Sequence, residues 1–180
     1  MGAPLPVGSG DLDVVPELDL SHSATKSPGC YTAAVGNSMA LIDDEVSAQL
    51  RQEFEQLRNP VRLVVFSQAL ADPAAEQVAR LVEETAALDS RLSVETRNFV
   101  LDKEKVAELG IARIPAVAVL GEEKDYGVRF YGLPSGYEFG SLVDAVLDVS
   151  MGESGLAPQT KEALRALPRA VHIQVFTTPT

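Results

Sequence analysis

Few residues of this chain could supply redox or metal chemistry. The sequence holds one cysteine, Cys30, and two histidines, His22 and His172, which lie far apart. One cysteine cannot form an internal disulfide or a Cys-X-X-Cys redox pair, and two distant histidines do not make a zinc site. Cys30 lies in a Gly- and Pro-containing stretch, where we interpret it as incidental. The sequence therefore predicts no metal site, no cofactor and no catalytic residue within these 180 residues.

Two other positions, Asp72 and Pro115, lie at the predicted starts of a helix and a strand. Asp72 precedes Pro73, Ala74 and Ala75, which is the pattern of a helix N-cap followed by proline in the first turn. A carboxylate there could act as a general base, but no histidine, lysine or metal partner is evident, so capping accounts for it. Pro115 follows Ile114 at the start of an apolar run. The sequence leaves its cis and trans isomers open, and its place in the element order favours cis.

Composition excludes several classes of function. The net charge is −11, with 15 Lys and Arg against 26 Asp and Glu, so the chain offers no overall basic surface for nucleic acid. No apolar run approaches the length of about 20 residues that spans a membrane. The first residues carry neither a basic region nor an apolar core of a secretion signal. We therefore expect a cytoplasmic protein without nucleic-acid or membrane partners.

Residues 1–39 differ from the rest of the chain. They are rich in Gly, Pro, Ser, Asp and Thr, and their apolar residues keep no helix or strand period. The sequence predicts a disordered leader or tail over this range. Met39 stands directly before an amphipathic pattern and resembles a natural start, so an upstream start or an added leader is an open alternative.

Residues 40–152 have the patterning of one α/β domain. The alternating start implies parallel pairing through crossovers, and the closing hairpin adds antiparallel strands. This order is that of a thioredoxin-like fold, a four-stranded mixed sheet flanked by helices. Asp102 is expected to cap the third helix. Helical periodicity predicts helices near residues 43–58, 73–89, 102–110 and 138–149, whereas β-branched runs and alternation predict strands near 61–66, 92–99, 114–120 and 126–131.

Residues 153–180 repeat the beginning of that domain. Apolar positions in Leu57–Phe66 recur in register in Leu167–Phe176, at an offset of about 110 residues. A predicted helix at 158–167 again precedes a predicted strand at 171–176. We interpret this range as the first helix and strand of a second, incomplete thioredoxin-like unit; a chance match of two helix–turn–strand segments is the alternative.

Four segments of the sequence resemble those of a known protein family. Asn59–Val61, Arg113–Ala116, Gly127–Phe139 and Val175–Thr180 resemble segments of tandem thioredoxin-fold, glutaredoxin-like protein disulfide oxidoreductases. The N-terminal domain of the alkyl hydroperoxide reductase flavoprotein is related to them. The resemblance implies that Ile114 and Pro115 bind polypeptide substrate, and that a segment like Thr178, Pro179 and Thr180 leads into Cys-Pro-Tyr-Cys.

Two departures from the family pattern follow. Where some relatives carry a Cys-X-X-Cys motif, this chain has a degenerate redox position from Asp72 to Ala75. The sequence also stops at Thr180, before the second unit's cysteine pair. We keep three explanations: a domain fragment, a truncated gene, or a selenocysteine codon read as stop, since a selenol suits the attacking position in thiol–disulfide exchange.

Two classes of function remain. In the first, the chain is the non-catalytic half of a thiol–disulfide oxidoreductase, with the second thioredoxin-like unit and polypeptide thiols or disulfides as partners. In the second, it is a stand-alone binding or scaffold module without enzymatic activity. Whether a second unit continues in the gene separates the two.

Overall fold

The computed structural model describes residues 40–68 and 72–176. The predicted disorder of residues 1–39, Cys30 within them, and the lead-in residues Thr178, Pro179 and Thr180 lie outside this range. The elements along the chain are helix α1 (Asp44–Phe54), strand β1 (Val61–Ser67), helix α2 (Pro73–Ala86), strand β2 (Leu92–Asn98), helix α3 (Lys103–Glu108), strand β3 (Ala116–Gly121), strand β4 (Val128–Tyr131), helix α4 (Tyr137–Met151) and helix α5 (Pro158–Arg165).

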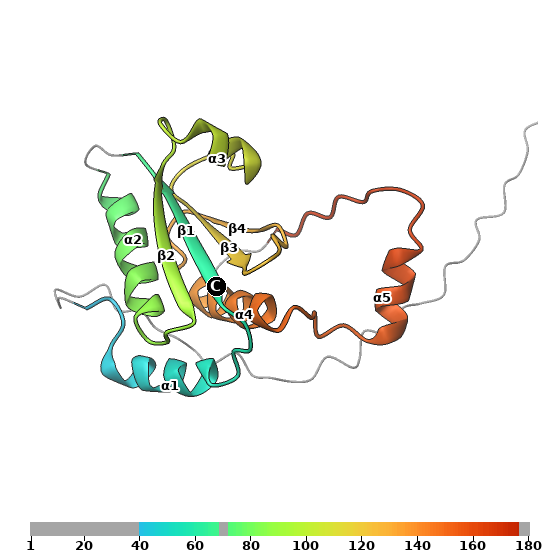
Figure 1. The fold of residues 1–180 in the computed structure, drawn as a ribbon, viewed down its shortest axis with the longest axis horizontal. Helices are drawn as coiled ribbons and strands as arrows, with labels where there is room; N and C mark the ends of the chain where they lie inside the picture. Colours follow the sequence, from blue (N-terminus) through green and yellow to red (C-terminus); the bar gives the residue numbers. More distant parts are fainter. Residues whose placement is uncertain (1–39, 69–71, 177–180) are drawn as a thin grey trace, which may run out of the picture. The chain divides into compact units, whose positions relative to one another are not determined.

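A mixed four-stranded sheet organises residues 40–154, with strand order β2-β1-β3-β4 (Figure 1). β1 runs parallel to β2 and antiparallel to β3, which in turn pairs antiparallel with β4. The β1–β2 connection passes through α2, as a parallel pair requires a crossover. The predicted α/β class and four-stranded mixed sheet are confirmed.

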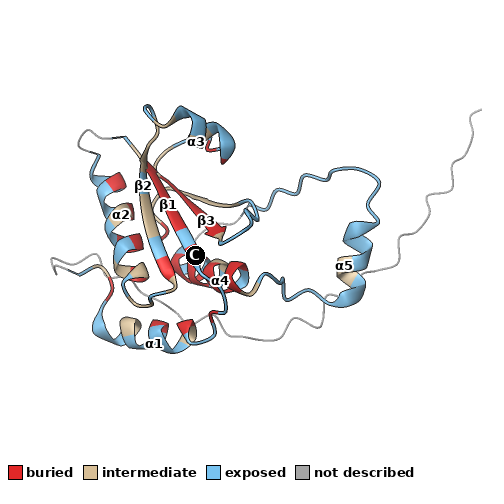
Figure 2. Cartoon of the chain, in the orientation of Figure 1, coloured by how far each residue is buried: buried red, intermediate tan, exposed pale blue. Residues whose placement is uncertain are grey.

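Helices cover the two faces of this sheet unequally. One face packs Leu63 and Val65 of β1 against the apolar sides of α1, α2 and α4. The opposite face packs Val64 and Phe66 against Leu109 and the segment around α3. Both central strands are thus buried on both sides, as the red of β1 and β3 shows (Figure 2). This explains their continuous runs of apolar residues.

The last described residues form a separate unit, 155–176. Helix α5 appears where a helix was predicted, with Pro158 in its first turn. The strand predicted at Val171–Phe176 is wrong for this structure: these residues adopt no strand, and their large apolar side chains are 58% to 89% exposed. A strand forms only by pairing with another, and no strand among the described residues pairs with this segment.

Asp102 occupies the expected N-cap position of α3, but its side chain does not cap the helix. Its backbone is not extended, and its Oδ2 instead accepts a hydrogen bond from the Asn98 amide at 2.6 Å. Asp102 therefore fastens the end of β2 rather than the start of α3.

Candidate functional site

The strand register brings the two sequence-predicted sites to one end of the sheet. Phe66, near the end of β1, lies opposite Ala116, the first residue of β3. Ser67 and Pro115, the next residues outward from this pair, therefore share that end of the sheet. From Ser67 the chain needs only residues 68–72 to reach the first turn of α2 (Figure 1).

The start of α2 shows what the degenerate redox position does. Asp72 has an extended backbone, and its Oδ1 accepts a hydrogen bond from the Ala74 amide at 3.0 Å. The carboxylate is thus an N-cap, as predicted, and Ala75, within the first turn of α2, is buried. Neither side chain can be oxidised to a disulfide. This helix start can bind or orient, but it carries no thiol chemistry.

The peptide bond between Ile114 and Pro115 is cis, as the element order favoured. The Pro115 carbonyl accepts a hydrogen bond from the Gly132 amide at 2.9 Å, which extends the β3–β4 pairing past its formal end. Within the described ranges, the amide and carbonyl of Ile114 have no hydrogen-bond partner. Backbone groups left unpaired in a folded protein face water or a partner, so the Ile114 backbone has one donor and one acceptor not used within the described residues.

Next to this bond lies a contact that the sequence analysis did not identify. The Arg113 guanidinium stands over the Tyr131 ring, 4.8 Å from its centroid. The Tyr131 hydroxyl is 3.5 Å from the Ala112 amide, which donates to it. Arg113 is exposed, and Tyr131 is half-buried at the end of β4. The position of Arg113 directly before Ile114–Pro115 was a signal in the sequence, but only the strand register shows that Tyr131 lies beneath it.

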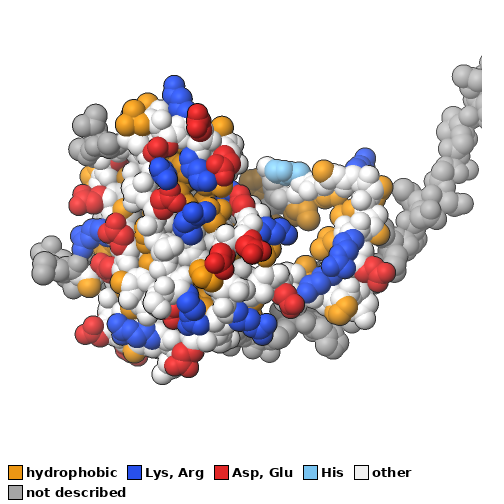
Figure 3. Space-filling model, viewed as in Figure 1, with side chains coloured by type: hydrophobic (Ala, Val, Ile, Leu, Met, Phe, Trp, Pro, Cys, Tyr) orange, Lys and Arg blue, Asp and Glu red, His pale blue; other side chains and the backbone are white. Residues whose placement is uncertain are grey.

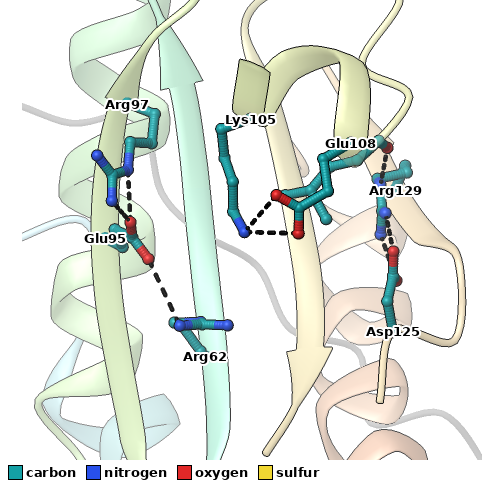
Figure 4. A network of polar contacts seen from close by, with 8 residues as sticks. Arg62, Glu95, Arg97, Lys105, Glu108, Asp125 and Arg129 are labelled. Carbon is teal, nitrogen blue, oxygen red and sulfur yellow. Dashed lines mark hydrogen bonds and ion pairs between the residues drawn. The ribbon is translucent and has the colours of Figure 1, made fainter. Parts of the chain in front are cut away.

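Away from this end, basic side chains on the α3 side of the sheet are already paired (Figure 4). Arg62 lies 3.8 Å from Glu95, and Lys105 donates to Glu108 at 2.8 Å. Arg129 pairs with Asp125, and this hydrogen bond holds the pKa of the Asp125 carboxyl below its usual range. The space-filling view likewise shows acidic and basic side chains interspersed (Figure 3). Arg62, Lys105 and Arg129 are therefore neutralised by neighbouring carboxylates.

Metal-binding clusters and membrane spans are both absent from the described residues. No group of three or more His, Cys, Asp or Glu side chains in this part of the chain could hold a metal ion. No described helix is long and apolar enough to cross a membrane.

Known proteins resemble parts of this chain, although no protein-family model matches it. An NADH dehydrogenase of Bacillus subtilis strain 168 is 36% identical over 61% of the chain, which covers 19% of that protein. The alkyl hydroperoxide reductase AhpF of Staphylococcus aureus strain Mu50 is 27% identical over 76% of the chain and 24% of that protein.

Solved structures show which part of such proteins is similar. The N-terminal domain of the alkyl hydroperoxide reductase AhpF from Enterococcus faecalis V583 superimposes with a TM-score of 0.65 and 29% identity, over 71% of this chain and 62% of that chain. This chain is related to that N-terminal domain. Its fold is thioredoxin-like, as predicted.

The same relation extends to a second solved protein. A protein disulfide oxidoreductase from Aeropyrum pernix K1 matches with a TM-score of 0.61 and 30% identity, over 69% of this chain and 55% of that chain. The chain is thus a unit related to thiol–disulfide oxidoreductases. It spans about a fifth to a quarter of the length of its curated relatives, since it covers 19% and 24% of the two named above.

Proposed function

We propose that this chain is the redox-silent docking unit of a thiol–disulfide oxidoreductase. An extended polypeptide binds beside Ile114–Pro115, and the cysteine pair that does the chemistry belongs to a second thioredoxin-like unit encoded beyond residue 180. The observation that carries the proposal is the unpaired backbone of Ile114, at the same end of the sheet as an α2 start that has Asp72 in place of a cysteine.

The docking step uses backbone hydrogen bonds. An extended peptide laid along Ile114 can accept from its amide and donate to its carbonyl, which adds a strand-like contact. Such contacts depend little on peptide sequence, so they suit a protein that handles many polypeptides. Pro115 is fixed by its bond to the Gly132 amide, so the binding edge is already formed before the peptide arrives.

The redox step then belongs to the second unit. One of its thiolates attacks a disulfide sulfur of the docked polypeptide, which releases the other substrate sulfur as a thiolate. Its second thiol resolves this mixed disulfide, so the polypeptide is reduced by two electrons and the pair is oxidised. A selenolate in the attacking position would perform the same exchange. In this proposal the chain acts in the cytoplasm, where thiols are kept reduced.

The gene itself tests the position of the redox pair. We expect the DNA after the Thr180 codon to continue in frame into a second unit with Cys-X-X-Cys, or to read TGA followed by codons for Pro-Tyr-Cys or a similar end. Any other continuation overturns this part of the proposal and favours the stand-alone binding or scaffold module. Reduction of insulin by dithiothreitol should not be accelerated by the 180-residue chain under either alternative.

Nuclear magnetic resonance tests the docking step. The probe is a blocked peptide of about nine residues in which Val alternates with Gln, chosen for its extended conformation and lack of charge. We expect its addition to shift the amide signals of Ile114 and Gly132 and to leave those of β2 in place. Unchanged signals at Ile114 up to the solubility limit of the peptide would overturn docking at this edge.

A further inference from the structure

Arg113 lies directly before Ile114, at the proposed docking edge, and carries a positive charge. We infer that Arg113 is a specificity-determining residue that selects extended polypeptides with an acidic side chain next to the segment bound at Ile114. The inference rests on the proposed docking function and deepens it. Its basis is the juxtaposition of Arg113, the Tyr131 ring and the unpaired Ile114 backbone.

Arg113 has a ring contact in place of a carboxylate partner, as does Lys124 between β3 and β4, but only Arg113 directly precedes Ile114. Arg62, Arg97, Lys105 and Arg129 each have a carboxylate partner in the network of Figure 4 or beside it. Over the described residues, Arg113 has no ion pair and no side-chain hydrogen bond, and its guanidinium contacts the Tyr131 ring instead. Residues 69–71, which lie outside the described ranges between β1 and α2, are alanine, leucine and alanine and carry no charge.

The ring orients the guanidinium without neutralising it. The guanidinium carbon Cζ of Arg113 lies over the Tyr131 ring, 4.8 Å from its centroid. A cation–π contact uses none of the guanidinium N–H groups, so these can still bind the two oxygens of a carboxylate together. Tyr131 is held in turn by β4 pairing and by the Ala112 amide. Less side-chain freedom is therefore lost when an acidic residue binds.

Close-range attraction is needed because the chain as a whole repels acids. Its net charge is −11, so an acidic peptide is disfavoured at long range. An unpaired arginine adjacent to the binding edge reverses this locally. Selection then depends on where the peptide carries its acidic residue and not on the peptide's total charge.

Matched peptides test the inference. The neutral Val/Gln peptide is compared with a set in which a single Gln is replaced by Glu at each position in turn, and dissociation constants are taken from the shift of the Ile114 amide. For each protein we take the ratio of the dissociation constant of the neutral peptide to that of the best Glu peptide. We expect this ratio to be about threefold higher for the native chain than for Arg113→Gln. Arg113→Lys should retain only part of this preference, because an ammonium cannot pair with two carboxylate oxygens.

Arg51→Gln is the control for net charge. Arg51 is an exposed arginine in the last turn of α1, which leads to the opposite end of β1. Its substitution removes the same charge far from Ile114, so the native preference for Glu should persist. Tyr131→Leu keeps the Arg113 charge but removes the ring, and should reduce the preference without abolishing binding of the neutral peptide.

The outcomes separate the inference from the proposed function. If the neutral peptide leaves the Ile114 amide unshifted, docking itself is wrong. If the neutral peptide binds but the ratio of dissociation constants for the neutral and Glu peptides is the same for the native chain and Arg113→Gln, docking stands and the role of Arg113 is overturned. If Arg113→Gln unfolds at a lower urea concentration than the native chain and this ratio is unchanged, Arg113 has only a structural role, and the inference is overturned.

Discussion

At the scale of single residues, one arginine fastens the end of α1 to the sheet. The Arg91 guanidinium donates to the carbonyls of Leu57 at 2.5 Å and Phe54 at 2.7 Å. The Phe54 carbonyl also accepts from the Leu57 amide at 3.0 Å, and a cation near the last turn of α1 complements the helix dipole. Asp89 holds the guanidinium in place through two hydrogen bonds, at 2.8 Å and 2.6 Å. The pair therefore connects α1 to the turn before β2.

Asp89→Asn should weaken the connection between α1 and the turn before β2. It should also remove the part of the stability that depends on the ionisation of Asp89. The hydrogen bond from Arg91 holds the pKa of Asp89 below its usual range, against the opposing effect of burial. A lowered folded-state pKa contributes stability above the unfolded pKa of about 3.9, and that contribution is lost as the pH falls through the folded value. We expect Asp89→Asn to lower the free energy of unfolding by about 1 kcal/mol at neutral pH. Urea titrations at neutral pH and below about pH 4 measure the difference, which should shrink in acid.

The control for this prediction is Glu122→Gln. Glu122 is exposed and has no ion pair within the described residues, so its substitution should change stability little at either pH. Equal losses for the two variants, or a loss for Asp89→Asn that grows in acid, would contradict the assigned role of the pair.

A buried hydroxyl makes a second connection. Ser150 Oγ accepts from the amides of Arg58 at 2.9 Å and Asn59 at 3.0 Å, and donates to the Asn59 carbonyl at 2.7 Å. Ser150→Ala removes the partner of these partly buried backbone groups and should cost about 1 kcal/mol in urea unfolding. Ser141→Ala, on the exposed side of the same helix, should cost less than about 0.5 kcal/mol. Similar costs at the two positions would refute the connection.

At the scale of elements, the end of α4 is fitted against the β3–β4 hairpin. Gly152 ends α4 with φ +69°, a left-handed conformation, and a Cβ there would meet the Tyr126 hydroxyl at 3.1 Å. Gly110 follows α3 with φ +62°, and a Cβ there would meet nothing within 4 Å. The two glycines therefore share a backbone requirement and differ in what surrounds them.

This difference gives a prediction for alanine at each position. Gly110→Ala should cost about 1 kcal/mol, because only the left-handed backbone is penalised. Gly152→Ala should cost about 1 kcal/mol more, since the Tyr126 hydroxyl must also move. In a Tyr126→Phe background the extra cost should disappear, as measured by urea unfolding. If it persists, the hydroxyl is not what the glycine accommodates.

At the scale of the whole molecule, residues 40–154 and 155–176 differ in burial. The first range contains both core clusters, whereas the second has no buried residue. Backbone without buried contacts opens locally at little cost and is cleaved first by proteases. Limited trypsin digestion should therefore cut after Arg169 and Arg165 before it cuts after any arginine of residues 40–154.

Mass spectrometry of the early products checks this order. Fragments that begin with residues beyond Arg169 should appear first, and the range from 40 to 154 should persist as the core. Early cleavage after Arg62 or Arg97, within β1 and β2, at the same rate would contradict the division.

Local sequence patterns determined most of the fold. Runs such as Val61–Phe66 are typical of buried strands, and Asp72–Pro73 is typical of a helix start, because each pattern depends on neighbours close in the chain. The order of these elements then specified the mixed sheet, since crossover and hairpin connections allow few arrangements. The resemblance to disulfide oxidoreductases, and not these patterns, marked Asp72–Ala75 as a degenerate redox position and Ile114–Pro115 as a binding position.

Only the tertiary structure decided what depends on distant partners. Val171–Phe176 has the alternation of a strand, yet it forms none, because a strand needs a second strand to bond with. Arg113 became a candidate for recognition only when pairing of β3 with β4 placed Tyr131 beneath it. Sequence period shows which face a residue belongs to, whereas the register between strands decides which side chain it meets.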